Sequence, residues 1–84
     1  MENVITFEMD FGVSEYIEKT TNDLIKGWLI NHNKLDVVVS SLCLGDLWSI
    51  SIDCHFLKNK NDILRVQQLT EQLLKRFEIP YKIA

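Results

Sequence analysis

Residues 36–57 read DVVVSSLCLGDLWSISIDCHFL and decide the fold. Two runs rich in β-branched and other apolar residues meet at Gly45-Asp46, which predicts a two-residue hairpin with glycine first in a type II′ turn. If those two residues form the loop, Leu44 pairs with Leu47, and each further cross-strand pair follows from that register. Because side chains alternate along a strand, the register assigns every residue of the hairpin to one of two sheet faces.

The elements around the hairpin complete a recognisable order. Residues 4–11 alternate between apolar and polar side chains and predict a half-buried strand, and residues 15–31 have helical spacing after the candidate N-cap Ser14. Gly27 is unfavourable inside that helix, and close contact with the sheet is one reason to expect it there. Residues 62–77 predict a second helix, and residues 81–83 predict a short final strand after Pro80.

This order of strand, helix, strand, strand, helix, strand predicts an α+β ferredoxin-like βαββαβ two-layer sandwich. Its four strands form one antiparallel sheet in the order 4-1-3-2, with two helices on one face. The 84 residues are expected to form a single domain, 1–84.

Composition narrows the classes of function. The net charge of −3 argues against nucleic acid, and no apolar run is long enough for direct membrane insertion. Two cysteines do not make a disulfide framework, and the first ten residues do not resemble a signal peptide, so we expect a cytoplasmic location. The sequence has no glycine-rich phosphate loop and no Ser-His-Asp arrangement, and these absences favour a protein that is not an enzyme.

The predicted register leaves one apolar group on the sheet face opposite the helices. This group comprises Val38, Leu42, Leu44 and Leu47, which we call the open-face patch. Apolar residues gathered on an uncovered face usually mark an interface, so we expect a homo-oligomer through this face. The competing interpretation is that a tail or loop covers the patch, or that the register is different.

The same face carries four polar residues that suggest a metal site. Glu8, Asp10, Asp53 and His55 are expected to cluster if the first strand lies beside the third, and such groups suit a divalent cation. This is the sole cofactor that the sequence suggests, and a solvated acidic patch near Lys82 is the alternative. Three hypotheses follow: a non-enzymatic oligomerisation or regulatory domain, a divalent-metal-binding regulatory module, and, on fold analogy alone, a small enzyme.

Several short motifs resemble the cytoplasmic α+β domain of small-conductance mechanosensitive channels. They are FEMDFGVSEYIEK at residues 7–19, the hairpin, DILR at 62–65 and EIPY at 78–81. The resemblance implies a non-catalytic domain that packs beside identical copies, next to a membrane protein. WSISIDCHFL at 48–57 and LLKRF at 73–77 are similar to the cytoplasmic domain of cation diffusion facilitators. That second resemblance implies a reduced metal site at His55.

Overall fold

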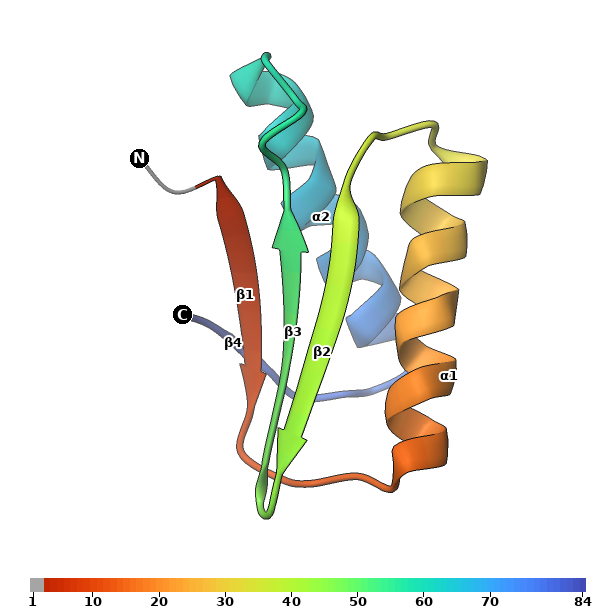
Figure 1. Cartoon of the computed structure of the whole chain (residues 1–84), viewed down its shortest axis with the longest axis vertical. Helices are drawn as coiled ribbons and strands as arrows, with labels where there is room; N and C mark the ends of the chain where they lie inside the picture. The colour runs from red at the N-terminus through yellow and green to blue at the C-terminus, as the bar shows by residue number, and fades with distance from the viewer. Residues whose placement is uncertain (1–2) are drawn as a thin grey trace.

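A computed structural model describes residues 3–84. Its elements are β1 (Val4–Met9), α1 (Glu15–Lys26), η1 (Gly27–His32), β2 (Val38–Leu44), β3 (Leu47–Asp53), α2 (Lys60–Arg76) and β4 (Lys82–Ile83). The strands form one antiparallel sheet in the order β2-β3-β1-β4, which is the predicted order 4-1-3-2 read from the other edge. Figure 1 shows this sheet with α2 behind it and α1 beside β2.

The hairpin has the predicted register. Leu44 pairs with Leu47, and the pairing continues without interruption to Val38 opposite Asp53. Gly45 adopts a φ of 56°, in the left-handed region that the first position of a type II′ turn requires. The turn therefore assigns the side chains of β2 and β3 to the faces that the sequence predicts.

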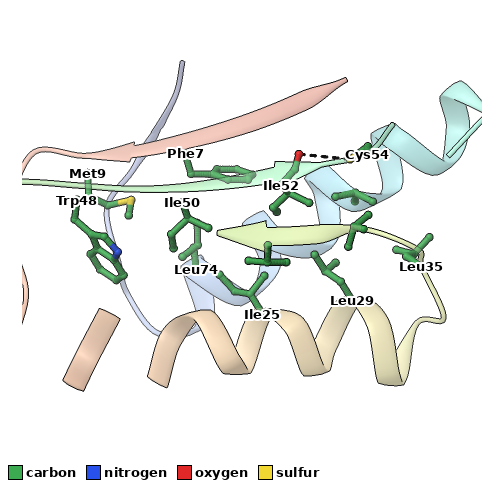
Figure 2. Close-up of a cluster of buried hydrophobic side chains, with 13 residues drawn as sticks. Phe7, Met9, Ile25, Leu29, Leu35, Trp48, Ile50, Ile52, Cys54 and Leu74 are labelled. Atoms are coloured by element: carbon green, nitrogen blue, oxygen red, sulfur yellow. Dashed lines mark hydrogen bonds between the residues drawn. The ribbon is translucent and has the colours of Figure 1, made fainter. Parts of the chain in front are cut away.

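The core lies between the sheet and the two helices. Phe7, Trp48, Ile50 and Ile52 of the sheet face Ile25, Leu29 and Leu74 of the helices (Figure 2). Val66 of α2 belongs to the same cluster, and all eight side chains are almost completely buried. Phe11 contacts Trp48 edge to face, with ring centroids 5.9 Å apart. Burial of these large apolar side chains is the main stabilising contribution to the fold.

Both α-helices begin with side-chain caps. The backbone N–H of Ile17 donates to the Ser14 hydroxyl at 3.3 Å, and the N–H of Asn61 donates to the Asn59 side chain at 2.8 Å. Each cap satisfies an N–H group that has no partner within its helix. The helices accordingly begin at Glu15 and Lys60.

The first helix ends in a different way from the one expected. Gly27–His32 form a π-helical segment, η1. Asn33 caps its C-terminal end by donating both its backbone N–H and its side-chain amide to the Trp28 carbonyl. The expectation that Gly27 closely contacts the sheet is wrong, because no atom from outside its own stretch of helix lies within 4 Å of the position that its Cβ would occupy. The Trp28 indole instead donates to the Leu69 carbonyl of α2 at 3.1 Å.

No helix within residues 3–84 is long and apolar enough to cross a membrane.

Candidate functional site

The open-face patch is exposed at every position. Val38 is 52% exposed, Leu42 55%, and Leu44 and Leu47 each 64%. Their neighbours in sequence, such as Val39 and Trp48, are buried against the helices, because side chains alternate between the two faces. Three of the four residues belong to β2, so most of the patch lies along one edge of the sheet.

A shallow groove of about 250 Å³ connects this patch to charged side chains. Leu42, Leu44 and Leu47 line its apolar part, and Glu8, Asp10 and Lys82 line its polar part. Glu8 and Lys82 are paired residues of the neighbouring strands β1 and β4. A surface of this kind combines apolar area with charges of both signs, which suits contact with another protein.

The four residues proposed for a metal site do not come together. β1 runs antiparallel to β3, so Val4 pairs with Asp53, whereas Glu8 pairs with Ser49. Glu8 and Asp53 are therefore four positions apart along the strands, which is about 13 Å at the usual rise of a β-strand. The predicted cluster is therefore corrected to two separate pairs, and residues 3–84 contain no group of three or more His, Cys, Asp or Glu that could hold a metal ion.

One of these pairs has well-defined geometry. The Asp53 carboxylate lies 2.8 Å from Nδ1 of His55 and accepts the backbone N–H of the same residue at 3.0 Å. The side-chain hydrogen bond from His55, followed by the backbone one, lowers the pKa of Asp53 below its ordinary value of 3.8. Both side chains are exposed, and their contact lies at the end of β3.

The other pair lies at the far end of β1. Glu8 and Asp10 line a second hollow of about 180 Å³ together with Pro80, Tyr81 and Lys82. The location agrees with the alternative interpretation, an acidic patch beside Lys82.

Sequence reasoning missed a partly buried contact between α2 and Tyr81, the residue before β4. The Tyr81 hydroxyl donates to the Glu71 carboxylate, which also accepts a hydrogen bond from Gln67 at 3.2 Å. Burial, and then the bond to Glu71, raises the pKa of Tyr81 to about 12, while the Tyr81 bond lowers the pKa of Glu71. The i, i+4 spacing of Gln67 and Glu71 was visible in the sequence, but the position of Tyr81 depends on the turn at Pro80.

The two cysteines are free and lie far apart. Cys43 pairs with Trp48 in the hairpin, six residues along the chain from Cys54, or about 20 Å along the strand. Burial, with a smaller effect of the Asp53 charge, raises the pKa of the Cys54 thiol to about 11. Cys43 is half-buried and its thiol donates to the Val13 carbonyl at 3.3 Å. Both therefore act as packing residues.

Comparison of the chain with protein-family models, with curated proteins and with solved structures finds no match in any of the three.

Proposed function

We propose that this chain is a small non-enzymatic domain that associates with copies of itself and serves an oligomerisation or regulatory role. The observation that supports this proposal is the open-face patch, four apolar side chains that are each more than half exposed. Apolar side chains gathered on an uncovered sheet face usually mark contact surfaces. Burying them in an interface would recover the free energy that their exposure to water forfeits.

The titratable groups also favour a binding role over catalysis. Asp53 is held by His55, and Glu71 is held by Tyr81 and Gln67, so local structural contacts explain the shifts of their pKa values. The Cys54 thiol is buried and has a raised pKa, which makes it a poor nucleophile.

We include in the proposal the ferredoxin-like assignment, a cytoplasmic location and a kinship with the soluble domain of a membrane transport protein. The element order and the strand order β2-β3-β1-β4 support the first of these. The motifs that resemble the domain of small-conductance mechanosensitive channels, including EIPY at 78–81, support the last. A domain of that kind would pack beside identical copies without carrying out a reaction.

Sedimentation equilibrium over a wide concentration range tests the proposal. The wild type should form oligomers at micromolar to millimolar concentrations, and Leu42→Glu should raise the dissociation constant about tenfold or more, because a charge replaces an apolar contact. Tyr16→Glu is the matched control, since Tyr16 is an exposed apolar residue on α1. A wild type that stays monomeric at millimolar concentration would refute self-association. A Leu42→Glu variant that associates as strongly as the wild type would refute the open-face patch as the interface.

A further inference from the structure

The two edges of the sheet differ in how they are protected. β4 has only two residues, follows Pro80 and carries Lys82, all features that discourage pairing with another strand. β2 has seven residues, VVSSLCL, with no charge, no proline and no glycine. Its unbroken register with β3 shows that no bulge interrupts it. β2 thus lacks the devices that natural proteins use to protect an edge strand.

The hairpin determines which backbone groups of β2 point to the free edge. Leu44 and Leu47 flank a two-residue loop, so each donates its N–H to the C=O of the other. Such hydrogen-bonded pairs recur at every second residue, so Leu42, Ser40 and Val38 also direct their N–H and C=O groups toward β3. The intervening residues Val39, Ser41 and Cys43 direct their N–H and C=O groups away from β3. Within residues 3–84, β3 is the sole strand that neighbours β2 in the sheet.

Along the free edge, Ser41 and Cys43 are half-buried, whereas Val39 is almost completely buried. α1 lies in a separate layer, with core side chains between it and the sheet (Figure 2). The Ser41 hydroxyl, which points to that layer, donates to the Glu18 carboxylate of α1 at 3.1 Å. These contacts occupy the side chain of Ser41 and leave its edge-facing backbone groups for another strand.

We propose that β2 pairs antiparallel with β2 of a second copy, so that two four-stranded sheets join into one sheet of eight strands about a two-fold axis. This inference rests on the proposed self-association and names its mode. A second copy suits the edge because the strand is uncharged along its whole length, and an antiparallel copy therefore places no like charges opposite each other within it.

The contact of Ser41 with Glu18 favours one register. Pairing centred on Ser41 would place the two Ser41 side chains opposite each other, together with the Glu18 carboxylates that they bind, whereas pairing centred on Ser40 places Ser41 opposite Val39 of the other copy. In the Ser40-centred register, Val38 of each copy lies opposite Leu42 of the other on the open face, so the pairing covers part of the open-face patch.

Amide hydrogen exchange by NMR tests this mode directly. In an oligomeric sample, the amides of Ser41 and Cys43, which are half-buried residues, should become protected, and the protection should fall as dilution produces monomer. An oligomer in which these two amides exchange as fast as those of exposed loops overturns edge pairing but leaves self-association intact. A protein that remains monomeric at millimolar concentration overturns both.

Two lysine substitutions on the same face provide an independent test. Ser40→Lys places two positive charges directly opposite each other at the two-fold axis, and it should raise the dimer dissociation constant about tenfold or more. Ser49→Lys lies one strand inward, between Leu42 and Glu8, and should leave that constant within about twofold of wild type. Equal weakening by both variants, or weakening by Ser49→Lys alone, would show face-to-face docking and refute the edge-paired dimer.

Discussion

Gly12 lies where the chain leaves β1 and passes the hairpin turn, and it allows no side chain there. A Cβ at Gly12 would lie 2.1 Å from the carbonyl oxygen of Gly45 and 3.2 Å from its carbonyl carbon. Gly27 provides a matched comparison, because no atom from outside its own stretch of helix lies within 4 Å of its Cβ position and its φ of −60° is helical. We expect Gly12→Ala and Gly27→Ala to change stability in opposite directions.

The expected magnitudes follow from these distances. Ordinary van der Waals contact begins at 3.4 Å, so the Gly12→Ala variant must move backbone by about 1.3 Å. The opposing atoms belong to the main chain and no rotamer change can relieve the contact, which suggests a loss of about 2–3 kcal/mol, toward the upper end for overpacking. Gly27→Ala should instead add about 0.5–1 kcal/mol, since alanine has less freedom in the unfolded chain and fits the helical conformation.

Urea unfolding measured by tryptophan fluorescence distinguishes the two outcomes. With a denaturant dependence of about 1 kcal/mol per molar, the midpoint should fall by about 2–3 M for Gly12→Ala and rise by up to about 1 M for Gly27→Ala. The buried Trp48 reports the core close to Phe11, the residue before Gly12.

The result that refutes this reasoning is a Gly12→Ala midpoint close to that of the wild type. It would mean that the loop and the turn are not held against each other as the structure describes. A Gly27→Ala variant as destabilised as Gly12→Ala would likewise show that free space and helical φ are not what determine the effect.

Three further predictions concern titratable groups. The raised pKa of Tyr81 means that its contribution to stability is complete below pH 10 and is lost as the pH rises toward about 12. Subtracting the tyrosinate absorbance titration of Tyr81→Phe from that of the wild type should show a titration midpoint at about pH 12. The lowered pKa of Asp53 means that its contribution to stability is present above pH 3.8 and is lost as the pH falls through the lower pKa of the folded state. NMR of the Asp53 carboxyl group should show its titration midpoint moving upward in His55→Ala, and an unchanged midpoint would contradict the hydrogen bond from His55 as the cause. In native protein Cys54 should react with a thiol reagent far more slowly than Cys43, and equal rates that both match those of unfolded protein would contradict its burial.

The hairpin was predictable because its signal is local. A Gly-Asp pair between two β-type runs determines the turn, the turn determines the register, and the register determines which side chains are exposed. Leu42 and Leu44 are therefore found on the open face, where the alternation places them. The core positions Ile50 and Ile52 follow from the same alternation.

Other features depended on direction or on long-range contact. The sequence predicts that β1 lies beside β3, and the structure confirms it. The antiparallel register, however, places Glu8 opposite Ser49, so Glu8 does not lie next to Asp53. The π-helical segment after Lys26 is coupled to tertiary contacts, in which the Trp28 indole binds a carbonyl of α2 and its ring stacks on His32. Helical periodicity in the sequence contains no information about those partners, and the expected helix over residues 15–31 therefore differs from the observed α1 and η1 at its end.

The unequal edges of the sheet also affect how many copies could join through strand pairing. A sheet with two open edges can add copies at both sides without end, which is the geometry of a fibre. Here the β4 edge, with Pro80 before its two residues, discourages a second pairing, so β2 is the better point of attachment in the sheet plane. Further strand addition to the proposed β2-paired dimer is therefore disfavoured, which would let the chain keep an uncharged strand at its surface without becoming a filament.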